Sequence, residues 1–144
     1  MSRLLIVSAG AMLALTSAAS SGAPDTKPLK ISKECSEFTG KTPSFCTITE
    51  SNLEAIPKGT RIFYHQPTNG APIFGDSLAT ITTDSGTVVG RCITFDVATP
   101  PSGTCAFTSG SDKLEGFQAV VNVSVDDKQI WHWDGVYLLG AKGE

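Results

Sequence analysis

Apolar and polar residues alternate along short runs of this chain, and residues typical of turns separate the runs. The clearest run is FQAVVNVSV at residues 117–125, in which every second residue from Phe117 to Val125 is apolar. This two-residue period places alternate side chains on opposite faces of a β-strand. No segment shows a sustained helical period. The pattern predicts an all-β protein, a small antiparallel β-barrel of about eight strands.

Turn residues divide the middle of the chain into hairpins. Residues 60–66 and 72–82 flank Asn69-Gly70, a strong signal for a two-residue hairpin loop. Asp84-Ser85-Gly86 then predicts a three-residue loop, with Gly86 in the left-handed conformation that such a loop requires. This loop sets one face of the next strand against Ile81 and Ala79. The residues on that face are Val89, Arg91, Ile93 and Phe95.

Arg91 is the one cation in this otherwise apolar row. One interpretation is an arginine that is exposed, or whose stem packs on apolar surface while its head stays in water. The other is an interior cation that faces oxygen atoms of a ligand, because the interior of a small barrel is where a ligand would bind.

The stretch WHWDGVY at residues 131–137 follows the run 117–125 after Asp126-Asp127-Lys128. A three-residue loop there sets Val125 opposite Gln129 and places the aromatic residues on the apolar face. A two-residue loop would set polar side chains among valines, so the first register is preferred. The predicted pairs are Val123 with Trp131, Val121 with Trp133, Ala119 with Gly135, and Phe117 with Tyr137. His132 and Asp134 then lie on the opposite face.

The first residues have the pattern of a secretory signal peptide. Arg3 precedes an apolar run from Leu4 to about Leu15, and Ser17 and Ala19 supply small side chains before a cleavage site. We expect a signal peptide at 1–19, a flexible polar leader at 20–33, and a single barrel domain at 34–144. The expected location is secreted or periplasmic. No other apolar run approaches the length of a membrane span.

Four cysteines follow the signal, and an even number in an exported chain suggests two disulfides with three possible connectivities. We favour Cys35 with Cys46 and Cys92 with Cys105, because each pair brackets a segment with turn residues near its middle. A zinc site is disfavoured, because the cysteine spacings do not resemble a CxxC pair and no histidine lies close in sequence.

Recognisable catalytic chemistry is sparse. His132 and Asp134 are two residues apart on one strand face, which does not create the short hydrogen bond of a catalytic triad, and no Ser or Cys has a recognisable nucleophile setting. His65 lies on a different strand, and no metal or cofactor motif is present. The formal net charge is −3 and no Lys or Arg cluster occurs, so the electrostatic signature of a nucleic-acid binder is absent.

The segment TCAFTSGSDKLEGFQAVVNVSV, followed by WHWDGVY, resembles the dirigent and allene oxide cyclase-like β-barrels over about residues 86–139. Thr108 and Gly110 match the family's turn, Leu114 matches its apolar position, and Gly116 matches the following glycine. The chain departs from the family pattern at Ser109, Ser111 and Asp112. The resemblance implies an eight-stranded barrel with a central cavity, often oligomeric, whose members in some cases steer cyclisation or coupling of reactive small molecules. The resemblance does not identify catalytic residues of the family in this chain.

These observations together favour a barrel that binds a small apolar or amphipathic molecule in its interior. Arg91 would be its polar handle, and the aromatic residues that line the site or form its packed centre would be Phe117, Trp131, Trp133 and Tyr137. One alternative is a cyclase or isomerase that acts without a covalent nucleophile. Another is a secreted protein-binding or inhibitor module that uses loops such as 39–44 or 99–104. A homo-oligomer is compatible with each.

Overall fold

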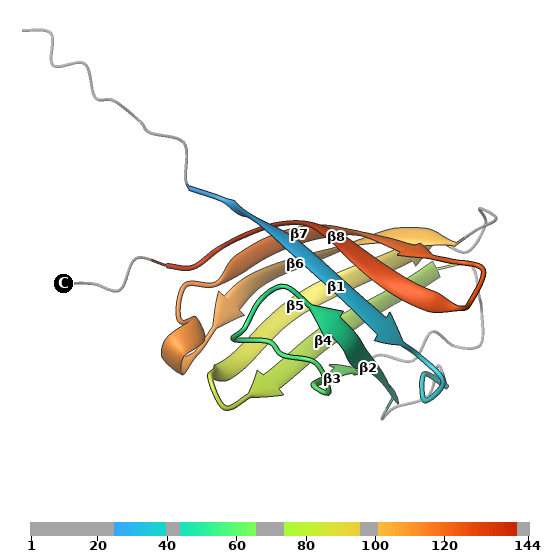
Figure 1. Ribbon diagram of the computed structural model, residues 1–144, viewed down its shortest axis with the longest axis horizontal. Coiled ribbons are helices and arrows are strands. Elements are labelled where there is room, and N and C mark those ends of the chain that lie inside the picture. Colours follow the sequence, from blue (N-terminus) through green and yellow to red (C-terminus); the bar gives the residue numbers. More distant parts are fainter. Residues whose placement is uncertain (1–24, 40–43, 66–73, 96–100, 141–144) are drawn as a thin grey trace, which may run out of the picture.

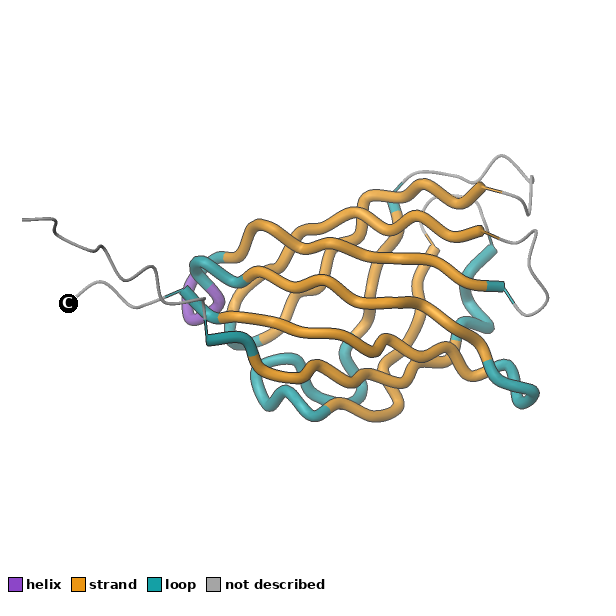
Figure 2. The backbone as a smooth tube through the Cα atoms, turned by 90° about the horizontal axis from the view of Figure 1, so that it is seen from above, coloured by secondary structure: helices purple, strands orange, loops and turns teal. Residues whose placement is uncertain are grey.

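The computed structural model describes residues 25–39, 44–65, 74–95 and 101–140. Its eight antiparallel strands each pair with the next along the chain, and β8 pairs with β1 to close the barrel (Figures 1 and 2). The predicted all-β barrel is confirmed. The strands are β1 Lys27–Glu34, β2 Ser44–Ser51, β3 Arg61–Tyr64, β4 Phe74–Thr83, β5 Gly86–Phe95, β6 Ser102–Gly110, β7 Gln118–Val125 and β8 Ile130–Leu138, with a 3₁₀ turn at Asp112–Leu114.

The strand β1 corrects the prediction of a flexible leader, because residues 27–33 of that segment are part of the barrel. Leu29 and Ile31 point inward, and Lys33 follows them on the same face. Pairing with β8 on one side and β2 on the other supplies the backbone hydrogen bonds that a polar segment could not gain alone. The predicted signal peptide at 1–19 and the Asn69-Gly70 turn lie outside the described residues.

Large side chains from several strands fill the middle of the barrel. Phe107 and Trp133 pack with ring centroids 5.3 Å apart, and both are buried. Gly90 makes room for this pair, since a β-carbon there would meet the Phe107 ring at 2.3 Å. Complete burial of such a side chain contributes about 1.5–3 kcal/mol. The middle of the barrel is therefore a packed core.

The β4–β5 hairpin has a shorter loop than its sequence predicts. Thr83 pairs with Gly86, which leaves Asp84 and Ser85 as the loop, although Gly86 has the expected positive φ (133°). One residue fewer in the loop moves every side chain of β5 to the other face. Val88 and Gly90 therefore face the interior with Ile81 and Ala79, so the predicted face that Arg91 shares with these two residues is wrong. Arg91 is exposed, which agrees with the first of its two interpretations and not with an interior cation.

The β7–β8 hairpin keeps the predicted faces but changes the predicted pairs. The Asp126 N–H donates to the carbonyl oxygen of Ile130 at 3.0 Å, so the three-residue loop spans 127–129, and Gln129 is left-handed (φ 63°). The loop starts one residue later than expected, which shifts the register by two and pairs Val123 with Trp133. A shift of two preserves faces, so the inward tryptophans and the outward His132 and Asp134 are confirmed.

Both predicted disulfides are present, with S–S distances of 2.06 Å for Cys35–Cys46 and 2.02 Å for Cys92–Cys105. Cys92 and Cys105 are directly opposite each other on β5 and β6, and Cys35 and Cys46 join β1 to β2. All four cysteines are paired, which is consistent with an oxidising compartment.

Candidate functional site

Lys33 carries a primary amine into the interior of the barrel. It is the last inward residue of β1, and its side chain is 3% exposed. It pairs with Trp131 of β8, and a register shift between Ser32 and Lys33 pairs it with Ile48 of β2. Strand alternation thus sets a lysine where an apolar side chain would be expected.

Aromatic side chains surround the Lys33 amine. Its Nζ donates a hydrogen bond to Tyr64 Oη at 2.5 Å and lies 4.3 Å from the centroid of the Trp133 ring. Phe38 packs edge-on against Tyr64, with ring centroids 5.1 Å apart. Among the described residues, no carboxylate lies within ion-pair distance of Lys33 Nζ. In the part of the chain that the structure describes, one phenol and cation–π contacts therefore hold the amine, and no counter-ion does.

Burial changes the proton affinity of both polar groups. Desolvation lowers the pKa of Lys33 from 10.5 to about 7, because the ammonium loses its hydration. The same desolvation raises the pKa of the Tyr64 phenol, which stays neutral throughout the physiological range. Near neutral pH, Lys33 is consequently present both as an ammonium and as a free amine, which is a nucleophile and a base.

A second buried donor lies in the same region. The indole Nε1 of Trp133 is buried and has no hydrogen-bond partner among the described residues. Its ring is the one that contacts the Lys33 ammonium. Buried polar groups are normally satisfied, so two donors with unused hydrogen-bonding capacity form a site that suits an added acceptor.

The site lies close to one end of the barrel, which we call the Lys33 end. Strands β1, β3, β5 and β7 finish at this end (Figure 1), and Tyr64 is the last residue of β3. Trp131, near the start of β8, is half-buried there, and Phe38 comes from the connection between β1 and β2.

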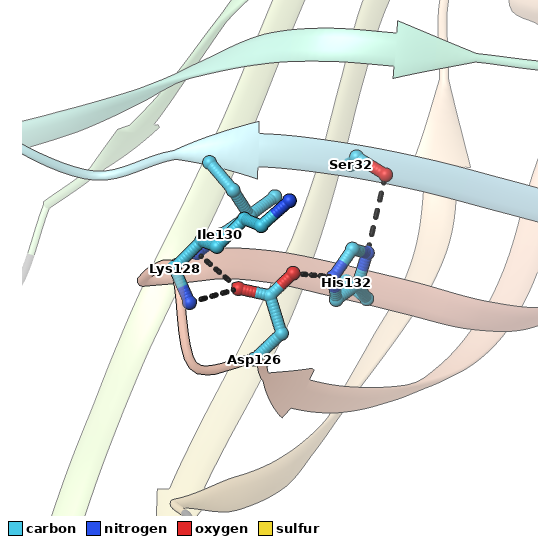
Figure 3. Close-up of polar contacts among 5 residues, drawn as sticks. All are labelled: Ser32, Asp126, Lys128, Ile130 and His132. Carbon is cyan, nitrogen blue, oxygen red and sulfur yellow. Dashed lines mark hydrogen bonds and ion pairs between the residues drawn. The ribbon is translucent and has the colours of Figure 1, made fainter.

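The outer face of the same strand pair holds a hydrogen-bonded chain of Ser32, His132 and Asp126 (Figure 3). His132 Nδ1 is 3.1 Å from Ser32 Oγ, and its Nε2 is 3.0 Å from Asp126 Oδ2. Asp126 Oδ1 also accepts the backbone N–H groups of Lys128 and Ile130. The hydrogen bond from His132 and those from the loop hold the pKa of Asp126 below its usual range.

This chain has the order of a catalytic triad but a different geometry. The imidazole of a triad meets the serine through Nε2 and the carboxylate through Nδ1, whereas here the two nitrogens are exchanged. Ser32 also lies within a strand paired on both sides, with His132 and with Glu50. Its surroundings thus lack the strand-to-helix turn that exposes a nucleophile and creates an oxyanion hole. The contacts serve to fasten the β7–β8 loop to β1.

An open groove runs along this outer face beside β1 and β8. Asp134, which lies two residues from His132 on the same strand face, forms an ion pair with Lys30 at 3.4 Å, and both side chains are exposed. Exposed pairs of this kind contribute little to stability. The groove's polar lining includes Lys30, Ser32, Glu50, Asn52, His132 and Asp134.

The five predicted ligand-binding residues do not form one site. Arg91 lies outside the barrel, where its Nε donates to Asp76 Oδ1 at 2.7 Å in a two-pronged ion pair. Phe117 and Trp133 are each 1% exposed, so both side chains are packed in the core. Trp131 lies near the Lys33 end, and Tyr137 lies near the other end, where it stacks on Phe117 with ring centroids 6.0 Å apart.

Sequence reasoning missed Lys33 and Tyr64. The signal that could have found Lys33 is the alternation Leu29, Ile31, Lys33, which continues an apolar face into a charged residue. The other histidine, His65, bonds Thr80 Oγ1 at 2.8 Å on the exposed surface. Within the described ranges, no group of three or more His, Cys, Asp or Glu residues could hold a metal ion.

The fold and site define a closed eight-stranded antiparallel barrel with two cross-strand disulfides and a buried lysine at one end. No protein-family model, curated protein or solved structure matches the chain. In the part of the chain that the structure describes, no helix has the length and apolar character needed to cross a membrane.

Proposed function

We propose that this protein is a secreted or periplasmic β-barrel that binds a small amphipathic molecule at the Lys33 end of its interior. One observation carries the proposal: a buried amine that has no carboxylate partner among the described residues lies among aromatic rings. An unpaired charge in a protein interior is destabilising, and an apolar side chain of similar volume would avoid that penalty. A ligand acceptor would give this amine a partner.

The chemistry of the site favours a ligand with an apolar body and a carboxylate or carbonyl group. Lys33 and the Trp133 indole N–H can donate hydrogen bonds to its oxygen atoms, while Phe38 and Trp131 offer apolar surface. The ligand would enter at the Lys33 end, because the middle of the barrel is packed. The polar handle in this proposal is Lys33, in place of Arg91.

Export and family membership belong to the same proposal. The signal-like first residues and the two disulfides support a secreted or periplasmic location. The closed eight-stranded barrel supports the resemblance to dirigent and allene oxide cyclase-like proteins. So do the buried side chain of Leu114 and the positive φ of Gly116 (72°), at positions where the family has an apolar residue and a glycine.

A second function, cyclisation or isomerisation of such a ligand, is favoured by one contact. The Lys33 amine and the Tyr64 phenol place a base and an acid 2.5 Å apart in a dry setting. A ligand that binds is incubated with the protein and then analysed for products. A cyclised or isomerised product indicates an enzyme, and recovery of the unchanged ligand indicates a binding protein.

The binding proposal is tested with two fluorescent probes of similar apolar size, anionic anilinonaphthalene sulfonate and neutral N-phenylnaphthylamine. Both should bind the wild type at about pH 6, where Lys33 is charged. Lys33→Met should weaken the anionic probe by about tenfold or more and the neutral one much less, because only the anion loses a charge-assisted hydrogen bond. Arg91→Met, on the outer face, is the matched control and should change neither. The proposal would be overturned if the wild type bound neither probe. It would also be overturned if Lys33→Met and Arg91→Met lost equal affinity for the anionic probe.

A further inference from the structure

We infer that Lys33 forms an imine with the carbonyl carbon of an aldehyde or ketone ligand at the Lys33 end of the barrel. This inference rests on the proposed function, since the ligand must first reach the site. It adds a covalent bond and narrows the ligand to carbonyl compounds.

Lys33 differs from every other described lysine in its location. The others, which are Lys27, Lys30, Lys58, Lys113 and Lys128, are all exposed. A solvated lysine amine is almost entirely protonated at neutral pH and so is a poor nucleophile. Within the described ranges no carboxylate forms an ion pair with Lys33 to retain its proton, and burial lowers its pKa to about 7, so a large share of it is free amine. Geometry and proton affinity both single out this one side chain.

Tyr64 supplies the proton transfers that imine formation requires. The Lys33 Nζ lone pair attacks the carbonyl carbon and forms the C–N bond, while the carbonyl electron pair moves to oxygen. Tyr64 Oη, 2.5 Å from Nζ, relays one proton from nitrogen to that oxygen and gives a neutral carbinolamine. The phenol then protonates the hydroxyl group, which leaves as water, and recovers a proton from the iminium nitrogen. The balance is amine plus carbonyl to imine plus water, with Tyr64 unchanged.

The surrounding rings favour survival of the adduct. The Trp133 ring, 4.3 Å from Nζ, can retain its cation–π contact with an iminium as it does with the ammonium. The buried position of Lys33 and Tyr64 limits access of water, which would hydrolyse an imine. An exposed lysine offers neither advantage.

The test uses the disulfide-bonded protein with decanal as the carbonyl probe and sodium cyanoborohydride to trap the imine as a stable alkyl amine. At about pH 7, peptide mapping should find Lys33 alkylated about tenfold or more above any exposed lysine. Tyr64→Phe should slow the labelling of Lys33 and leave the labelling of the exposed lysines unchanged. Lys33→Arg should remove the label and keep the charge, and Lys30→Arg on the outer face of the same strand is the matched control.

A parallel measurement separates this inference from the proposed function. Decanol has the same chain but no carbonyl, and its reversible binding is followed by displacement of N-phenylnaphthylamine. If decanol binds and decanal labels only exposed amines, the imine is overturned and the binding function stands. If decanol does not bind and Lys33 is not labelled, both are overturned. If decanal labels Lys33 and decanol binds, both the imine and the binding function are supported. If decanal labels Lys33 but decanol does not bind, the imine is supported and reversible binding is overturned.

Discussion

Replacement of Lys33 by Met should stabilise the protein at low pH, because it removes a buried ammonium and keeps an unbranched side chain. A pKa lowered from 10.5 to about 7 corresponds to destabilisation on the order of 5 kcal/mol at pH values below 7. Against this, the substitution leaves Tyr64 Oη without its 2.5 Å hydrogen bond. An unsatisfied buried hydroxyl costs about 1–3 kcal/mol. The expected net gain is therefore about 2–4 kcal/mol below pH 7.

The gain should disappear as the pH rises. Between pH values of about 7 and 10.5, the unfolded chain binds more protons at Lys33 than the folded chain does, so the wild-type free energy of unfolding increases with pH. Above this window the folded and unfolded forms of Lys33 are both neutral, and the wild type keeps the hydrogen bond to Tyr64. Lys33→Met should then be the less stable protein.

The assay is urea unfolding with the disulfides intact, at about pH 6 and about pH 10, for the wild type, Lys33→Met and Lys30→Met. Lys30 lies on the same strand but is exposed and paired with Asp134, so its replacement should leave the pH profile nearly parallel to that of the wild type. A Lys33→Met profile that also runs parallel to the wild type would refute the lowered pKa and the buried, unpaired amine on which it depends.

Three further substitutions test other parts of the structure. Trp133→Ala should reduce the free energy of unfolding by about 3–5 kcal/mol, because the side chain is packed; a loss below about 1 kcal/mol would place it beside open space. Gly90→Ala should destabilise the barrel by about 1–3 kcal/mol in urea unfolding, because the new β-carbon would meet the Phe107 ring, and a neutral effect would contradict this packing. Asp126→Asn should flatten the acid side of the stability profile: the hydrogen bond from His132 lowers the Asp126 pKa, so its contribution is present above the unfolded pKa and is lost as the pH falls through the folded one. An unchanged acid profile would count against that contact.

Alternation in the sequence predicts which faces of a strand are buried more reliably than it predicts register. In β7 and β8, the loop starts one residue later than expected because Asp126 caps it, and the resulting shift of two leaves Trp131 and Trp133 inward. In β4 and β5, a loop shorter by one residue reversed the faces and moved Arg91 outside. Local turn chemistry decides between these outcomes, and several loop lengths are compatible with the same residues.

The disulfides could be predicted from the sequence, whereas the buried lysine was not. The pairing of Cys92 with Cys105 was predictable because hairpin partners are close in sequence. The burial of Lys33 was not predicted, because its charge made the end of this strand look like part of a polar leader. Its burial depends on Trp133 and Tyr64, which lie on other strands and far away in sequence. The alternation of Leu29, Ile31 and Lys33 indicates the inward face, but no local pattern indicates which distant residues surround the amine.

The pairing of β1 with β8 has a consequence for the kinetics of folding. Every other strand pair joins neighbours along the chain, whereas Ser32 and His132 are 100 residues apart, and neither disulfide crosses this seam. Closure of so long a segment costs about 2 kcal/mol more in chain entropy than closure of a ten-residue hairpin, so the seam should form late. Until then β1 is an open edge and Lys33 is hydrated. Because burial beside Trp133 lowers the pKa of Lys33 from 10.5 to about 7, closure between these pH values also releases a proton. Within that window, the rate of this last step should increase as the solution becomes more alkaline.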